Sequence, residues 1–158
     1  GVSVYSPSRA LQAISTEGIE IIQLPTNILD RRFEKADVFE AAKKEKKETY
    51  IRSVFLQGLI LMMPQELPDN LALARPYVEK ILSLSRENKI SERQLALGYV
   101  KYAMPNAKIV VGIENSMQLN QIIHDFDTKC PSSVLAKIKA GFENVDEKII
   151  NPSRWQRG

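Results

Sequence analysis

The sequence predicts an α/β protein in which parallel strands alternate with helices. Four apolar and β-branched runs, at residues 2–5, 19–24, 49–56 and 108–113, are typical of buried strands. Helical patterns separate these runs, and such alternation favours parallel strands joined by right-handed crossovers. Four strands of this kind fit either an open doubly wound sheet or half of an eight-stranded barrel.

The third run has the strongest pattern and is followed at once by a candidate binding loop. After Leu56 the chain reaches Gly58 and continues as an apolar segment up to Pro64. In α/β proteins, ligands bind where strands end in such loops, although a plain core strand that turns at its glycine has the same pattern. No Gly-x-Gly-x-x-Gly or Gly-x-x-x-x-Gly-Lys turn follows any strand, which argues against a free-standing nucleotide-binding sheet.

The helices are expected from caps and apolar spacing. A short helix should follow Ser6 and end before Gly18, and Asp30 is predicted to cap a helix that continues to about Lys47. Pro76 is tolerable only near a helix start, so a helix of about three turns should follow it. The capping-box spacing of residues 91–94 predicts another helix, which should end near Ala103.

The last third of the chain is expected to contain two further helices and a tail. Ser116 is predicted to cap the first, and Pro131 to open the second. The apolar residues expected on their inner faces are Leu119, Ile122, Ile123 and Phe126, and then Val134, Leu135, Ile138 and Phe142. The tail around Trp155 should be irregular. Because no linker divides the chain, residues 1–158 are expected to form a single domain.

Composition and charge exclude several classes of function. The chain has 158 residues, of which 44% are hydrophobic and 26% charged, and its net charge is +3. The dense basic run at residues 43–48 is interrupted by glutamates and lacks interleaved aromatic residues, so it is typical of a solvated helix end. We therefore expect no nucleic-acid binding.

Targeting signals are also lacking in the sequence. No apolar stretch approaches about 18 residues and no signal peptide is visible, so we expect no membrane association. Cys130 is the only cysteine, which rules out an internal disulfide and favours a reducing, cytoplasmic location. The chain starts at Gly1 within strand-like alternation, and we expect it to be part of a longer protein.

The residues alone give no catalytic or metal site. His124, the only histidine, is expected at the surface, because Asp125 and Asp127 beside it on a helix would not direct three ligands at one ion. A nucleophile pair of His124 and Cys130 would need an orienting partner, and none is apparent.

Several strand ends resemble the second half of the aldo-keto reductases. The segments, in order, are GVSVY, IIQLPTNILDRR, IRSVFLQGLILM, residues 94–100 and VVGIENSMQL, and INPSRW is similar to the tail of one bacterial subgroup. This family folds as a (βα)₈ or TIM barrel and transfers hydride from NADPH to aldehydes and ketones. The resemblance implies a parallel (βα)₄ half-barrel, corresponding to the fifth to eighth strands, with an extra C-terminal helix and tail.

The resemblance also implies residues that bind a nicotinamide cofactor, NADP or NAD. Ser3 and Gln23 match side chains that contact the nicotinamide carboxamide, and Arg52 replaces an aromatic residue that stacks on the nicotinamide ring. Residues that match or continue a loop over the pyrophosphate are Ser53, Phe55, Leu56, Gln57 and Gly58. Residues that correspond to the adenosine-phosphate site are Gly112, Glu114, Gln118, Leu119 and Gln121.

Two departures from the family affect the expected function. Glu114 would repel a 2′-phosphate, which puts a preference for NADP in doubt. The family's catalytic Asp, Tyr, Lys and His lie on its first four strands, and neither Tyr5 nor Tyr50 stands at a matching place, so the chain alone is expected to be inactive. The alternative is a non-catalytic half-barrel that serves nucleotide binding or assembly. In either case two open strand edges and an apolar face should be covered, by the missing N-terminal half or by self-association.

Overall fold

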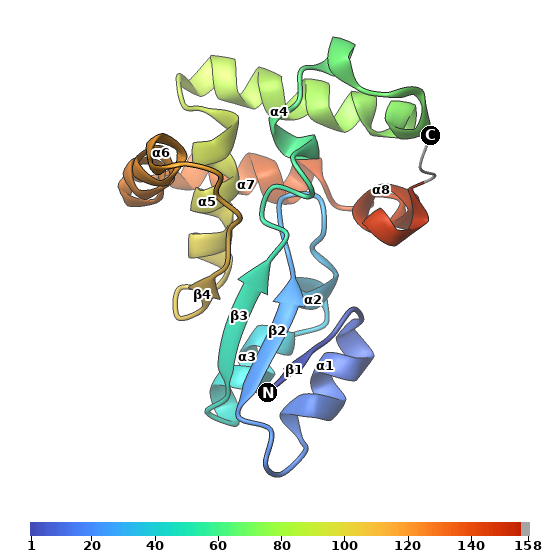
Figure 1. Cartoon of the computed structure of the whole chain (residues 1–158), viewed down its shortest axis with the longest axis vertical. Coiled ribbons are helices and arrows are strands. Elements are labelled where there is room, and N and C mark those ends of the chain that lie inside the picture. The colour runs from blue at the N-terminus through green and yellow to red at the C-terminus, as the bar shows by residue number, and fades with distance from the viewer. Residues whose placement is uncertain (156–158) are drawn as a thin grey trace.

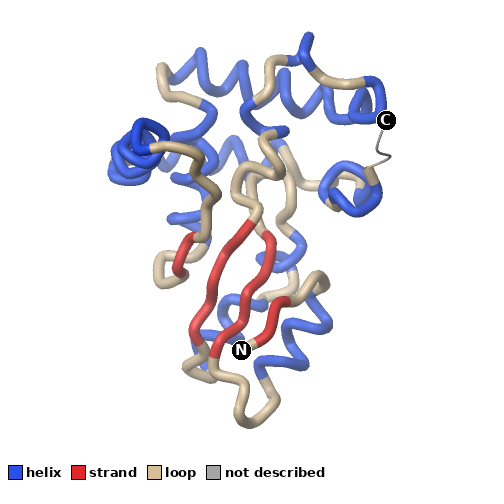
Figure 2. Tube along the Cα trace, viewed as in Figure 1, coloured by secondary structure: helices blue, strands red, loops and turns tan. Residues whose placement is uncertain are grey.

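The computed structural model describes residues 1–155 and contains a four-stranded parallel sheet (Figures 1 and 2). Its strands are β1 (Val2–Ser3), β2 (Ile21–Pro25), β3 (Glu48–Arg52) and β4 (Lys108–Ile109), arranged in the order β1-β2-β3-β4. All three pairings are parallel. The alternation of strands and helices therefore predicted the fold class correctly.

The two faces of the sheet have different environments. Ile22, Leu24 and Ile51 are fully buried, and α2 (Arg32–Lys35) and α3 (Val38–Lys44) lie behind β2 and β3 (Figure 1). On the opposite face, no helix of the described residues crosses in front of these strands (Figure 1).

The uncovered face is mixed in polarity, whereas an apolar face was expected. Lys108, the register partner of Tyr50, donates to the Tyr50 hydroxyl at 3.1 Å and forms a 2.8 Å ion pair with Glu48. Ile21 and Val110 add exposed apolar surface to the same sheet. The polar residues alternate with the buried ones, as the two-residue period of a strand requires.

The strands are shorter than the sequence suggests. The third was expected to reach residue 56 but ends at Arg52, since Ser53 and Leu56 have φ values of 60° and 47°, which no strand can include. The fourth pairs only at residues 108–109, with one further bond from Val110 N–H to the Ile51 carbonyl. The first pairs at residues 2–3, followed by a bond from Val4 N–H to the Gln23 carbonyl.

The predicted helix from Asp30 to Lys47 is wrong, because two shorter helices occupy this region. Asp37, between α2 and α3, has φ = 53°, and a left-handed residue interrupts a helix. Asp30 is fully buried and its carboxylate binds the Arg32 guanidinium at 2.8 Å, while Arg31 takes the capping position.

Three of the other helices follow their sequence signals closely. In α1 (Pro7–Ile14) the Ser6 hydroxyl accepts from the Arg9 N–H, and in α5 (Glu92–Ala103) Ser91 and Gln94 complete the predicted capping box. The predicted inner face of α7 (Ser132–Gly141) is buried. The remaining longer helix of this part is α4 (Arg75–Asn88), and short 3₁₀ turns precede it at Leu59–Leu61, Pro64–Glu66 and Asp69–Ala74.

Helix α6 (Ser116–Asp127) differs from its prediction in two ways. Asn115, one residue before Ser116, caps it, since the Asn115 side chain accepts from the Gln118 N–H. The expected apolar inner face is only half covered: Ile122 and Phe126 pack against the core, whereas Leu119 is 39% and Ile123 is 51% exposed, and Asp125 is buried. In Figure 1, α6 lies at the outer side of α5, and no other helix or strand of the described residues lies beyond it.

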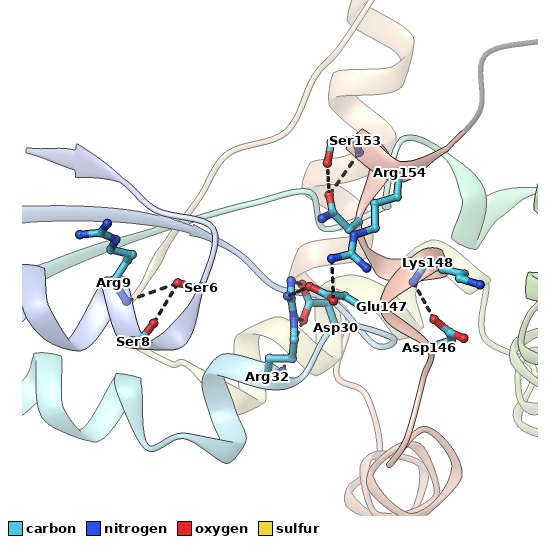
Figure 3. Close-up of polar contacts among 11 residues, drawn as sticks. Ser6, Ser8, Arg9, Asp30, Arg32, Asp146, Glu147, Lys148, Ser153 and Arg154 are labelled. Carbon is cyan, nitrogen blue, oxygen red and sulfur yellow. Dashed lines mark hydrogen bonds and ion pairs between the residues drawn. The ribbon is translucent and has the colours of Figure 1, made fainter.

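The C-terminal segment packs against the loop that follows β2. Arg32, held by Asp30, also reaches Glu147 at 3.3 Å, and Glu147 binds Arg154 at 3.1 Å (Figure 3). The segment contains α8 (Glu147–Ile150) and a 3₁₀ turn at Pro152–Arg154. Trp155 closes it by donating to the Ile149 carbonyl at 3.0 Å. Within residues 1–155, no helix combines the length and the apolar character required to cross a membrane.

Candidate functional site

Strand pairing brings together Ser3, the last residue of β1, and Gln23, the central residue of β2. The two residues are partners in the strand register, so their side chains leave the sheet on the same face. The Ser3 hydroxyl donates a 3.1 Å hydrogen bond to the Gln23 side-chain oxygen. This bond leaves the Gln23 amide nitrogen available as a donor, and a hydroxyl next to an amide is a suitable partner for another planar amide.

Arg52 ends β3 on the same face of the sheet and contacts Tyr5, which the sequence did not place in the site. Its guanidinium carbon lies 4.3 Å from the centre of the Tyr5 ring, which is a cation–π arrangement. One terminal nitrogen, Nη1, lies 3.4 Å from the Ser53 hydroxyl, and the other, Nη2, is buried without a hydrogen-bond partner. Tyr5 therefore belongs to this edge of the sheet. The sequence contained the signal, because Tyr5 follows Ser3 by two residues and so points to the same side.

The loop at residues 53–58 contains several residues with positive φ values, and a hydrogen bond from Asn27 ties it to the loop after β2. Ser53, Leu56, Gln57 and Gly58 all have positive φ values, between 47° and 87°. The buried Asn27 side chain donates to the Ser53 carbonyl at 3.0 Å, and it joins the loops after β2 and β3, which leave the sheet together (Figure 2). Leu56 is buried in the core, its N–H donates to the Ser53 carbonyl at 2.9 Å, and its carbonyl accepts from the Leu59 N–H at 3.0 Å. Phe55 is half-buried and Gln57 is exposed.

A second group of predicted residues lies after β4. The Glu114 N–H donates to the Gln118 side-chain oxygen at 2.9 Å, and the Gln118 amide nitrogen lies 3.5 Å from the Glu114 carboxylate. Gly112 is exposed just before this turn. Gln121 is not part of the group, since it accepts a 3.3 Å hydrogen bond from Arg93 of α5. The structure thus pairs Glu114 with Gln118 and directs Gln121 elsewhere.

The titratable groups with shifted pKa values lie outside these strand ends. Burial and the adjacent Glu34 carboxylate raise the pKa of Tyr99, whose hydroxyl donates to Glu34 at 2.7 Å among α2, α5 and α7. Burial raises the pKa of the Cys130 thiol, which makes its thiolate less available. His124 is exposed, as expected. Within residues 1–155, no cluster of three or more His, Cys, Asp or Glu side chains is suited to hold a metal ion.

Comparison with known proteins identifies the family from which this geometry derives. The model of the aldo/keto reductase family matches residues 1–141. The chain belongs to this family. No curated protein sequence matches it.

Solved aldo-keto reductases share its fold at low sequence identity. The chain is similar to aldo-keto reductase AKR11C1 from Bacillus halodurans in its apo form, with a TM-score of 0.73, 19% identity, and coverage of 96% of this chain and 53% of that one. For the holo form the TM-score is 0.72, again at 19% identity, with coverage of 96% and 52%. For the glycerol dehydrogenase AKR11B4 from Gluconobacter oxydans it is 0.67 at 18% identity, with coverage of 93% and 51%. The chain spans about half the length of these structures, and its sheet is half of their TIM barrel.

Proposed function

We propose that the chain is the C-terminal, cofactor-binding half of an NAD(P)H-dependent aldo-keto reductase. The observation that carries this proposal is the hydrogen-bonded Ser3–Gln23 pair on adjacent parallel strands, with Ser3 ending β1 and Gln23 two residues before the C-terminal end of β2. In parallel α/β sheets the C-terminal ends of the strands form the ligand-binding side. The pair offers a donor and acceptors to the carboxamide of a nicotinamide ring, which is the role that the family resemblance implies for both residues.

Within this proposal the two groups of residues have different roles. Ser3 and Gln23 orient the nicotinamide, and the loop at residues 53–58 presents backbone N–H groups to the pyrophosphate. Gly112, Glu114 and Gln118 lie near the adenosine ribose. The hydride comes from the bound nicotinamide. A proton donor for the carbonyl oxygen has to be supplied by the other half of the barrel, so residues 1–158 bind the cofactor without catalysing reduction.

The proposal also requires a partner for the two sheet edges. Within the described residues, β1 and β4 are terminal strands, and exposed apolar side chains lie beside both. These are Tyr5, Leu11 and Ile21 near β1, and Val110, Ile113, Met117, Leu119 and Ile123 near β4 and α6. An N-terminal half-barrel would cover both groups. The alternative is a second copy of the chain, with β1 of each copy beside β4 of the other, in which case the chain is an assembly module.

Titration of the purified chain with NADH and NADPH, monitored by nicotinamide fluorescence, tests cofactor binding. A parallel assay of aldehyde reduction tests the absence of catalysis, and sedimentation at micromolar concentration tests pairing. We expect binding without turnover, and a species larger than the monomer unless the other half-barrel is present. Absence of binding for both cofactors would refute the proposal. Turnover that is lost in Tyr5→Phe or Tyr50→Phe would show that the catalytic group had been assigned to the wrong half.

A further inference from the structure

The side chain of Asn27 connects the two loops that follow β2 and β3. Its oxygen Oδ1 accepts from the N–H groups of Leu29 and Asp30, both at 2.9 Å, and so closes the turn after β2. Its nitrogen Nδ2 donates to the Ser53 carbonyl at 3.0 Å. Because two N–H donors face Oδ1, the amide has one favourable orientation, with its own N–H group directed at Ser53. Asn27 is fully buried, so water does not compete for these bonds.

The turn that carries Asn27 is itself held firmly. The Thr26 hydroxyl donates to the Asp30 carbonyl at 2.9 Å, and both residues are fully buried. The Asp30 carboxylate accepts two hydrogen bonds of 2.8 Å, from Nε and Nη2 of Arg32. Paired charge-assisted bonds of this kind fix geometry as well as contributing energy. Asn27 therefore stands on a rigid support from which it can hold the neighbouring loop.

The loop at residues 53–58 has a backbone conformation that needs such support. Ser53, Leu56 and Gln57 have φ values of 60°, 47° and 55°, in the region that side chains with a Cβ disfavour. The loop itself contributes a 2.9 Å bond from the Leu56 N–H to the Ser53 carbonyl, the same carbonyl that Asn27 binds. Among the described residues, the N–H groups of Gln57 and Gly58 have no main-chain acceptor, so they are donors that the loop can offer to a ligand.

We propose that Asn27 is a positioning residue for the loop at residues 53–58, and that the affinity for the dinucleotide depends on its bond to the Ser53 carbonyl. Since Asn27 is fully buried, it acts through Ser53 and not on the ligand itself. With the Ser53 carbonyl fixed, the loop keeps its binding conformation in the free chain, and less ordering is required when the ligand binds. The link to the cofactor rests on the proposed function, whereas the hold on the loop does not.

Asn27→Asp separates the two roles of this side chain. The carboxylate keeps an acceptor for its own turn but lacks the donor for the Ser53 carbonyl. We expect NADH binding, measured by nicotinamide fluorescence, to weaken by about fivefold or more, the size associated with one hydrogen bond. The matched control is Asn88→Asp, because the Asn88 amide nitrogen donates to the Leu84 carbonyl at 2.8 Å within α4. The control should bind NADH as the wild type does. An equal loss in both variants, or no loss in Asn27→Asp, would overturn the proposal.

Amide hydrogen exchange without any cofactor tests whether the effect is local. In Asn27→Asp the Leu56 N–H should exchange at least about fivefold faster than in the wild type, because the loop opens more often. The Met104 N–H, bonded to the Val100 carbonyl at the end of α5, should keep its rate. Equal acceleration of both amides would indicate general destabilisation and would refute the positioning role. Faster exchange at Leu56 alone, in a chain whose wild type binds neither NADH nor NADPH, would refute the proposed function and leave the hold on the loop intact.

A third measurement uses only the wild-type chain and so does not depend on the folding of a variant. On saturation with NADH, the side-chain amide resonances of Asn27 should shift together with the backbone N–H resonances of Gln57 and Gly58. The side-chain amide resonances of Asn88 should not shift. Shifts at Gln57 and Gly58 without any shift at Asn27 would show that the loop binds independently of Asn27, which contradicts the proposal.

Discussion

The Ser3 hydroxyl donates to the Gln23 side-chain oxygen at 3.1 Å across two adjacent parallel strands. The bond sets the orientation of the Gln23 amide, so its nitrogen is directed away from Ser3 and can donate to a ligand. Strand pairing holds both Cα atoms in place, since Val4 N–H also bonds to the Gln23 carbonyl at 2.9 Å. The pair is thus supported by rigid backbone, which is what precise binding of a small planar group requires.

Gln23→Glu should weaken NADH binding by about tenfold, because it removes the amide donor and places a negative charge at the carboxamide position. Ser3→Ala should have a smaller effect, of about threefold, since Gln23 remains but loses the bond that orients it. Fluorescence titration measures both. The matched control is Gln65→Glu, at an exposed glutamine of a 3₁₀ turn. A loss of affinity in the control equal to that of Gln23→Glu would remove the argument for a specific site.

Glu114→Arg should shift cofactor preference toward NADPH by about tenfold, with NADH binding nearly unchanged. Glu114 is exposed, and its backbone N–H is bonded to Gln118 at 2.9 Å, so the turn keeps its shape while the side chain changes sign. A carboxylate can accept from a ribose 2′-hydroxyl but repels a 2′-phosphate. The ratio of the two dissociation constants is the measurement, and it should move toward the wild-type value at high salt. Glu66→Arg, at another exposed glutamate, is the control; an unaltered ratio in Glu114→Arg would identify Glu114 as a solvated surface charge.

The sequence predicts those features of the fold that depend on side-chain pattern. The parallel sheet follows from the alternation of apolar runs, and α5 follows from the spacing of Ser91 and Gln94. Both signals are local and agree with the final packing. Ser3 and Gln23 could be matched because both lie on predicted strands, where register alone brings their side chains together.

The features that were missed depend on backbone conformation or on neighbours. Positive φ values at Asp37, Ser53 and Leu56 interrupt the predicted helix and end the predicted strand, and no glycine marks these positions. The apolar stripe of α6 has the correct spacing, yet Ile123 is 51% exposed, because a helical pattern gives an apolar face but does not specify what covers it. The contact between Arg52 and Tyr5 joins β3 to β1, which are not neighbours in the sheet.

Glu34→Gln should destabilise the fold by about 1–3 kcal/mol near neutral pH, the cost of disrupting a largely buried charged network. Glu34 accepts from the Tyr99 hydroxyl at 2.7 Å and from Arg31 Nε at 2.8 Å, and it binds Lys139 at 3.0 Å. Burial on its own would raise the pKa of Glu34, but the hydrogen bonds from Arg31, Tyr99 and Lys139 outweigh it, and the pKa is lowered.

The lowered pKa determines how this stability varies with pH. The unfolded glutamate titrates near pH 4.3, so the contribution is fully present above about that value and is lost as the pH falls through the lower, folded pKa. Urea unfolding at a series of pH values should therefore show the difference between wild type and Glu34→Gln shrinking toward acid. Glu147→Gln is the control, since Glu147 is 45% exposed and its ion pairs should contribute less than about 1 kcal/mol. A difference that stays constant down to acid pH would contradict the argument.

Gly98→Ala should destabilise the chain by about 1–3 kcal/mol, although alanine is the better helix former by about 1 kcal/mol. A Cβ at position 98, within α5, would lie 2.5 Å from the Cβ of Cys130, and this neighbour is too close to its own backbone to move aside. Cys130→Gly removes the atom that clashes, so the double variant should recover part of the loss, and urea unfolding of the full cycle measures the coupling. The control is Gly141→Ala, where the new Cβ would meet only the flexible end of Lys80 at 2.8 Å, and it should cost much less. Additive effects of Gly98→Ala and Cys130→Gly would show that α5 can shift away from residue 130, and would contradict the close packing at this point.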